Sequence, residues 1–169
     1  MYKIGEYIVK NGNGVCRVVD IVHLDMDGID KNRLYYLLVP INDEHGRVYL
    51  PVDTSAQQTR KVMSMEGAYE LIANISDIQE ISISNDKLLE QKYKETIKNI
   101  DPKSLFRIIK TTYLRKRDRL EKGKKNTVAD EHYLTLAEKH LFSELCLVLG
   151  KTKEEVHDLI VAAVNKSGD

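Results

Sequence analysis

The chain has 169 residues, of which 42% are hydrophobic and 31% are charged, a length that suits one domain or two small ones. Lys and Arg number 26, Asp and Glu also number 26, and this balance excludes a uniformly basic or uniformly acidic chain. The two cysteines, Cys16 and Cys146, are too few for a disulfide scaffold and are expected to be reduced and buried. We find no signal peptide and no apolar run of ~18 residues, so we expect a cytoplasmic protein without a membrane span.

The first part of the chain has the pattern of a small, strongly bent sheet. Short apolar runs between turns rich in Gly, Asn and Asp predict strands at 3–10, 15–24, 33–39, 47–51 and near 60–63. Asn11 to Gly14, with the sequence NGNG, is a strong hairpin signal, because Asn and Gly tolerate positive φ. In the second run, one face is expected to carry Cys16, Val18, Val22 and Leu24, with Asp20 as the exception.

The remainder of the chain has the periodicity of five helices. Their expected N-caps are Ser64, Asn85 or Asp86, Asp101 before Pro102, a residue near Asp130, and Thr152 in a capping box with Glu155. Gly123 and Gly150 are expected to end the third and fourth helices. The inner stripes of the second and third helices are predicted to contain Leu89, Tyr93, Ile97 and Ile100, and Leu105, Ile108, Ile109, Thr112 and Leu120.

The N-terminal strands resemble those of a known family. The residues that carry the resemblance are KIGEYIVKNGNGVCRVVDI, then a YYLL strand, then VYLPVD. They are similar to the RNA-polymerase-interacting domain of the CarD/CdnL family of bacterial transcription regulators, and to the equivalent module of the transcription-repair coupling factor. The order of elements is the specific part of the match, and it continues into the helices.

The resemblance implies an α+β fold with two domains. Residues 1–62 would form a Tudor-like or SH3-like five-stranded β-barrel that binds the β subunit of RNA polymerase. Residues 63–169 would form a five-helix bundle that contacts promoter DNA, largely independently of sequence, near the upstream edge of the transcription bubble. The protein would modulate the stability of the open complex as a monomer, associated with the nucleoid through polymerase.

The strand at 47–51 is the one expected to face polymerase. Arg47, Tyr49 and Pro51 are therefore the expected contacts, through strand-edge pairing and an Arg or Tyr anchor. Relatives often have Arg where Tyr49 stands. The alternative is that Tyr49 packs within the sheet against Tyr35 or Tyr36.

A basic cluster marks the third helix. Residues 87–125 contain 14 Lys or Arg and five Asp or Glu. Such a run can neutralise several phosphates, with steep salt dependence, or it can be a solvated helix face with Asp118 and Glu121 as partial counterions. The expected DNA contacts in this cluster are Arg115, Arg117, Arg119, Lys122, Lys124 and Lys125, although residues 115–119 wind around a helix and cannot all face one duplex.

The segment LEQKYK, residues 89–94, adds Leu89, Lys92, Tyr93 and Lys94 to the expected DNA contacts. Many relatives carry W-x-x-R-Y-K here, with a Trp that enters the minor groove, and Leu89 stands at the Trp position. Leu can act as a wedge with a smaller stacking surface, or it can be a core residue. Asp130 and Glu131 are a second departure, because relatives often have a more basic stretch at this helix start.

No pattern in the sequence predicts an enzyme. The five histidines are scattered, and we expect no metal site, cofactor or nucleotide-binding loop. The alternative function is a protein-interaction adaptor of RNA polymerase that makes no direct DNA contact, because a basic helical face could also bind an acidic protein.

Overall fold

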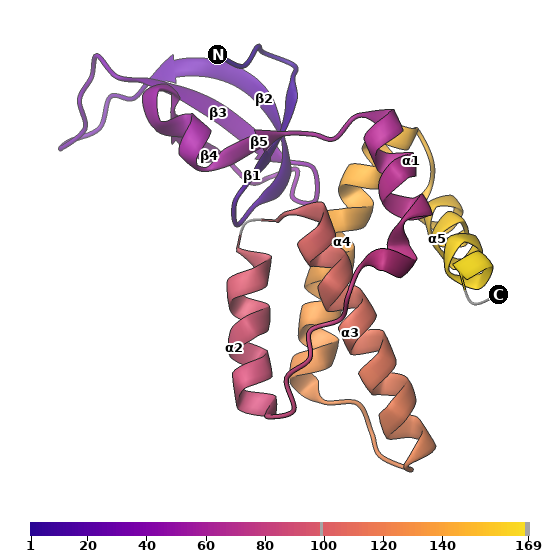
Figure 1. The fold of residues 1–169 in the computed structure, drawn as a ribbon. Coiled ribbons are helices and arrows are strands. Elements are labelled where there is room, and N and C mark those ends of the chain that lie inside the picture. Colours follow the sequence, from indigo (N-terminus) through magenta and orange to yellow (C-terminus); the bar gives the residue numbers. More distant parts are fainter. Residues whose placement is uncertain (99, 168–169) are drawn as a thin grey trace. The chain divides into compact units, whose positions relative to one another are not determined.

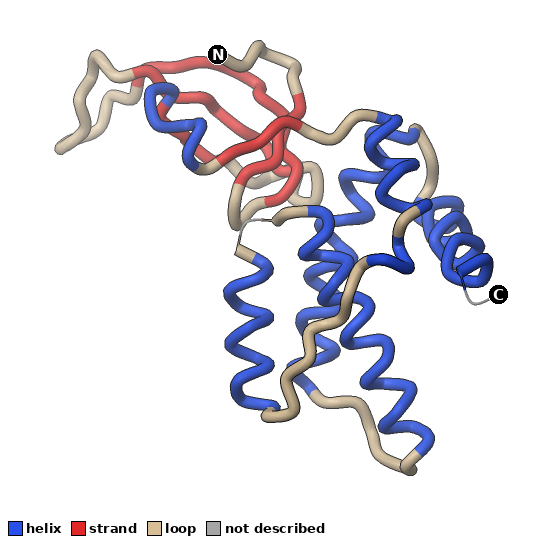
Figure 2. Tube along the Cα trace, in the orientation of Figure 1, coloured by secondary structure: helices blue, strands red, loops and turns tan. Residues whose placement is uncertain are grey.

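The computed structural model describes residues 1–98 and 100–167 and divides the chain into two compact units, Met1–Val62 and Met63–Asp169. The first unit is built from strands and the second from helices, as the ribbon and the tube show (Figures 1 and 2). The α+β class predicted from the sequence is confirmed. None of the helices in the described part of the chain is long and apolar enough to cross a membrane.

The first unit is a single antiparallel sheet with the strand order β4-β3-β2-β1-β5. Its strands are β1 (Tyr7–Lys10), β2 (Gly14–His23), β3 (Leu34–Pro40), β4 (Val48–Pro51) and β5 (Thr59–Lys61). The NGNG turn joins β1 to β2 as predicted, with Gly12 and Gly14 at φ of 81° and 76°, in the left-handed region that glycine tolerates. All five strands predicted from the sequence are present.

Strand β2 contains a bulge that changes which residues face the core. The register with β3 runs from Val18 opposite Leu38 directly to Asp20 opposite Leu37, which leaves Val19 without a partner. After the bulge the alternation is inverted, so Ile21 rather than Val22 packs against the core, and Asp20 is exposed. The predicted face of Cys16, Val18 and Val22 is therefore correct only before the bulge.

The expected barrel is not closed by strand pairing, because β4 and β5 are the two edges of the sheet. A 3-10 helix, η1 (Val52–Gln57), connects these edges and packs against β3, β4 and β5. The Tyr2 hydroxyl shares a hydrogen bond of 2.9 Å with the Thr59 hydroxyl, and the Tyr2 amide donates to the Tyr36 hydroxyl at 2.8 Å. The N-terminal segment thus helps to cover a core of Ile8, Cys16, Val18, Tyr36, Leu38 and Leu50.

The second unit contains the five α-helices predicted from the sequence. They are α1 (Met65–Ala73), α2 (Asp86–Ile97), α3 (Pro102–Glu121), α4 (Val128–Leu149) and α5 (Lys153–Ser167), with a 3-10 turn η2 (Ile75–Asp77) after α1. Ser64, Asn85 and Asp101 act as N-caps, as expected, and each side chain accepts a hydrogen bond from a backbone N–H of the first turn. Helix α4 begins earlier than expected, because Thr127 caps it.

Helices α3 and α4 form the centre of this unit as a helical hairpin. Helix α2 packs on both of them, while α1 and α5 pack on α4 and on each other (Figure 1). Leu105, Ile108, Leu141 and Leu145 are fully buried in the resulting core. The prediction that Leu120 belongs to the buried stripe of α3 is wrong: its side chain is 61% exposed. In Figure 1 the last turns of α3 form the lower tip of the helical unit, where no other helix covers them.

Candidate binding surfaces

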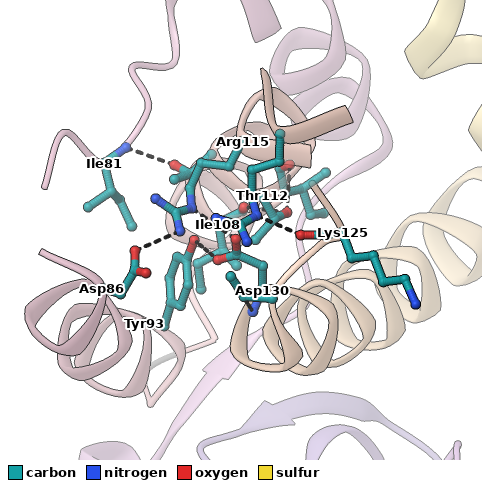
Figure 3. Close-up of polar contacts among 12 residues, drawn as sticks. Ile81, Asp86, Tyr93, Ile108, Thr112, Arg115, Lys125 and Asp130 are labelled. Carbon is teal, nitrogen blue, oxygen red and sulfur yellow. Dashed lines mark hydrogen bonds and ion pairs between the residues drawn. The ribbon is translucent and has the colours of Figure 1, made fainter. Parts of the chain in front are cut away.

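An ionic network around the buried Asp130 connects three helices of the second unit. The Arg115 guanidinium on α3 lies between two carboxylates, with its Nε 2.9 Å from Oδ2 of Asp130 and a terminal nitrogen 2.9 Å from Oδ1 of Asp86 (Figure 3). The Tyr93 hydroxyl on α2 donates to the other Asp130 oxygen at 2.8 Å. The network therefore holds α2, α3 and the start of α4 together.

Burial of Asp130 and Tyr93 strengthens the electrostatic interactions at the centre of this network. Asp130 is 1% exposed, so its charge needs the nearby guanidinium as compensation. Burial raises the pKa of the Tyr93 hydroxyl, and the hydrogen bond to Asp130 raises it further, so Tyr93 stays a neutral donor. Burial alone would lower the pKa of Arg115, but its hydrogen bonds to Asp130 and Asp86 outweigh that effect and raise it. Arg115 is permanently charged within this network.

Three of the expected DNA contacts lie in this network or beside it. Leu89 is 2% exposed and Tyr93 is fully buried, because both lie on the face of α2 that packs on α3 and α4. Arg115 is occupied by two carboxylates. In this structure Leu89 and Tyr93 offer no surface to a partner, and Arg115 serves the fold. Asp130 was expected to repel DNA at the start of α4. Because it is buried and paired with Arg115, it does not present a bare negative charge to phosphate.

Two more residues of the basic cluster serve the end of α3. Gly123 has φ of 70°, and its amide and that of Lys124 donate to the carbonyls of Leu120 and Arg119 at 3.0 and 2.7 Å, which is a Schellman motif. The Nε of Arg119 donates to the Lys125 carbonyl at 2.7 Å, and Lys122 forms an ion pair with Asp118 at 3.1 Å. Arg119 therefore holds the loop after α3 in place, and Lys122 pairs with the last turn of the helix.

Four basic side chains at the end of α3 and in the loop after it face solvent. Lys116, Arg117, Lys124 and Lys125 are exposed. None of these four takes part in an ion pair among the residues that the structure describes. On α2, Lys87, Lys94 and Lys98 are exposed on the side away from Leu89, and Lys92 is half-buried. The basic residues thus form two sets that the sequence alone does not distinguish. Arg115, Arg119 and Lys122 make contacts within the protein, and the exposed set consists of Lys116, Arg117, Lys124 and Lys125.

Sequence reasoning missed the exposed apolar residues of the same helices. Leu88 on α2 is 56% exposed and directly precedes the buried Leu89. Tyr113 on α3 is 65% exposed. The sequence carries a signal for both, because each lies off the predicted inner stripe of its helix.

On the first unit, Tyr49 faces solvent from the edge strand β4. It is paired with Leu37 across the ladder, while its neighbour Leu50 is paired with Tyr36 on the opposite, buried face. Tyr49 is 47% exposed and lies on the face of the sheet opposite to Tyr36, so the alternative of packing against Tyr36 is excluded. Arg47 is exposed and donates to the carbonyls of Glu44 and Gly46 at 3.0 and 2.8 Å, and Pro51 is half-buried.

The described residues contain no arrangement of side chains typical of catalysis. No group of three or more His, Cys, Asp or Glu residues lies close enough to hold a metal ion within 1–98 and 100–167. Burial raises the pKa of the Cys16 thiol to about 11, which disfavours the reactive thiolate.

Comparison with known proteins identifies the first unit. Residues 2–63 match the family of the CarD-like/TRCF RID domain. The match ends one residue after the first unit, so it assigns the sheet to this domain family and covers none of the α-helices. It confirms the resemblance found in the sequence and suggests a domain that interacts with RNA polymerase. No curated protein gives a significant match to the chain.

Proposed function

We propose that this protein is a bacterial transcription regulator that binds the RNA polymerase β subunit through its N-terminal unit and promoter DNA through its helical unit. The observation that carries the proposal is the CarD-like/TRCF RID domain at residues 2–63 together with the exposed edge strand β4. Contact with DNA near the upstream edge of the transcription bubble would then alter the stability of the open complex.

The edge strand β4 has the features of a protein-docking edge. No strand of the described part of the chain pairs with its outer side, so its backbone groups there can pair with an incoming strand. Tyr49 adds a large exposed ring, and Arg47 at the start of the strand adds a guanidinium, the two residue types most enriched at interface centres besides Trp. Pro51 ends the strand and limits how far pairing can extend.

The exposed set of basic residues supports the DNA part of the proposal. Lys116, Arg117, Lys124 and Lys125 lie close together in sequence at the end of α3, where the Schellman motif and the Arg119 hydrogen bond fix the loop. Long cations on a fixed backbone suit phosphate oxygens and give binding that is independent of sequence and steeply dependent on salt. Lys87, Lys94 and Lys98 provide a second row on α2.

A contact of α2 with the minor groove would use Leu88 rather than Leu89. Leu88 is the exposed leucine, and Lys92 lies one turn further along the same helix. An apolar side chain flanked by a cation is the combination with which minor-groove binders open a base step. Tethering by polymerase would make even a weak contact of this kind effective, since it raises the local concentration of the helical unit at the promoter.

The polymerase contact can be tested with the full chain and purified core polymerase by isothermal titration calorimetry. We expect Tyr49→Ala and Arg47→Glu each to weaken binding about tenfold or more, the range of an interface anchor. Tyr69→Ala is the matched control, because Tyr69 on α1 is similarly exposed at 45% in the other unit. Unchanged affinity of both β4 variants, with native circular dichroism spectra, would rule out this surface.

A further inference from the structure

One face of α3 carries two exposed apolar side chains beside the basic ones, and the DNA proposal does not use these apolar residues. Tyr113, Lys116, Arg117 and Leu120 follow the spacing i, i+3, i+4 and i+7, so they form one stripe along the helix. Tyr113 and Leu120 are 65% and 61% exposed, and Lys116 and Arg117 between them are also exposed. The opposite side of the helix holds the buried Thr111 and the paired Arg115.

The apolar residues of this stripe are spaced like a row of bases. Seven residues of helix separate Tyr113 from Leu120, which corresponds to about 10.5 Å along the axis. Stacked bases of one DNA strand rise by about 3.4 Å each, so the same length spans about three base steps. The two cations, Lys116 and Arg117, lie between the two apolar residues along the helix.

The charge around the stripe selects a polyanion as its partner. Lys124 and Lys125 follow the stripe in sequence and are exposed in the loop after Gly123, whose backbone is held by hydrogen bonds to Arg119. Of the two acidic residues in this turn region, Asp118 is paired with Lys122 and Glu121 is exposed. An acidic protein could satisfy the cations, but the phosphates of a nucleic acid recur at intervals that match a linear row of lysine and arginine better than scattered carboxylates do.

An exposed ring between cations favours unpaired nucleic acid over a duplex. In a duplex the faces of the bases are covered by their neighbours, so Tyr113 and Leu120 could reach only base edges. In an unpaired strand each base presents a free face, and stacking on an aromatic side chain is favourable for every base. The convex helix also lets a flexible strand follow the stripe.

We propose that the Tyr113–Leu120 stripe of α3 binds an unpaired nucleic-acid strand, with Tyr113 as a stacking platform and Lys116, Arg117, Lys124 and Lys125 on the phosphates. This inference rests on the proposed function and refines it. The helical unit would hold a strand exposed by promoter opening, in addition to the neighbouring duplex.

The test is fluorescence anisotropy with the full chain and a labelled DNA of about ten nucleotides, which is in the range of site sizes for such surfaces. The DNA is used as a mixed-sequence single strand and as the matching duplex. We expect tighter binding of the single strand at low salt. Tyr113→Ala should weaken it about tenfold without changing the salt slope, because stacking releases no counterions. Tyr113→Phe should retain binding, and Arg117→Gln should lower the salt slope of single-strand binding by about 0.7.

Tyr69→Ala on α1 is the control, and it should leave single-strand binding unchanged. Equal or tighter binding of the duplex would overturn the inference and leave the proposed DNA binding intact, as would a Tyr113→Ala variant that behaves like Tyr69→Ala. Binding of neither DNA also contradicts the inference. In that case the lifetime of polymerase–promoter complexes, measured with the tethered protein, decides separately whether the proposed function holds.

Discussion

Two arginines only two positions apart have opposite roles in this protein. Arg115 lies between Asp86 and Asp130 inside the helical unit, while Arg117 faces solvent. A helix turns by about 100° per residue, so two positions turn the side chain to nearly the opposite side. The composition of the basic cluster therefore overstates how many of its charges can reach a partner.

This contrast predicts different effects of the same substitution. Arg115→Met should lower the free energy of unfolding by about 3–5 kcal/mol, because it leaves the buried Asp130 without its counterion. Arg117→Met should change it by less than about 0.5 kcal/mol, as is usual for exposed positions. Urea denaturation followed by circular dichroism measures both values. Equal stability of the two variants would show that the Arg115 network does not hold the helices together.

His140 on α4 makes stability depend on pH. Burial, assisted by the positive charge of Lys139, lowers the pKa of His140 below its usual 6.5, and its buried Nδ1 has no hydrogen-bond partner among the described residues. The folded state thus favours the neutral ring, while the unfolded chain takes up the proton first as the pH falls below about 6.5. The contribution of His140 to stability is present above that pH and is lost below it.

We therefore expect the free energy of unfolding to decrease between about pH 7 and pH 5, and to decrease less in His140→Gln, which cannot take up a proton. Urea denaturation at a series of pH values gives the comparison. Parallel pH profiles for the two proteins would mean that His140 is as easily protonated in the folded state as in the unfolded chain.

At the scale of single elements, local signals predicted the helices and turns well. Ser64, Asn85, Asp101 and the NGNG turn have the roles that their sequence context predicts, because capping and turn formation depend on a few neighbouring residues. The bulge at Val19 was not predictable in this way. It depends on the register with β3, and the only trace in the sequence is the polar Asp20 in an apolar alternation.

Helix α2 shows how helix packing affects the expected DNA contacts. The apolar periodicity of the sequence correctly placed Leu89 and Tyr93 on an inner stripe, whereas the comparison with relatives assigned the same residues to DNA. One helix face cannot both pack in the core and contact DNA. Because α2 packs on α3 and α4, this face belongs to the core. The pairing of Arg115 could not be predicted either, because Asp86 and Asp130 are far from it in sequence.

Adjacent leucines on α2 give a direct test of this packing. Leu89→Ala should cost about 2–5 kcal/mol of stability, because it leaves a cavity in the core. Leu88→Ala should cost less than about 0.5 kcal/mol, since Leu88 is exposed. Thermal and urea denaturation distinguish the two variants. A large loss of stability on truncation of Leu88, with little on truncation of Leu89, would contradict the placement of α2.

At the scale of the whole molecule, the zero net charge conceals an uneven distribution. Residues 87–125 carry nine more positive than negative charges, and from Met63 to Asp86 the chain has five acidic residues and no Lys or Arg. A RID domain in one unit and an exposed basic set in the other give the chain two surfaces of different chemistry. Their combination is the basis for the proposed bridge between polymerase and promoter.

The most direct test of this account is the lifetime of the polymerase–promoter open complex with the double variant Arg117→Glu and Lys124→Glu. The matched control is Lys153→Glu with Lys166→Glu, two exposed residues of α5 that give the same change in net charge. We expect the first variant to bind polymerase normally and to lose the effect on open-complex lifetime. The salt dependence of its DNA binding should also fall by about two units of slope. We expect the control to behave like the unmodified protein. A wild-type lifetime effect and salt slope in the first variant would contradict DNA contact by this surface and favour an adaptor that binds polymerase alone.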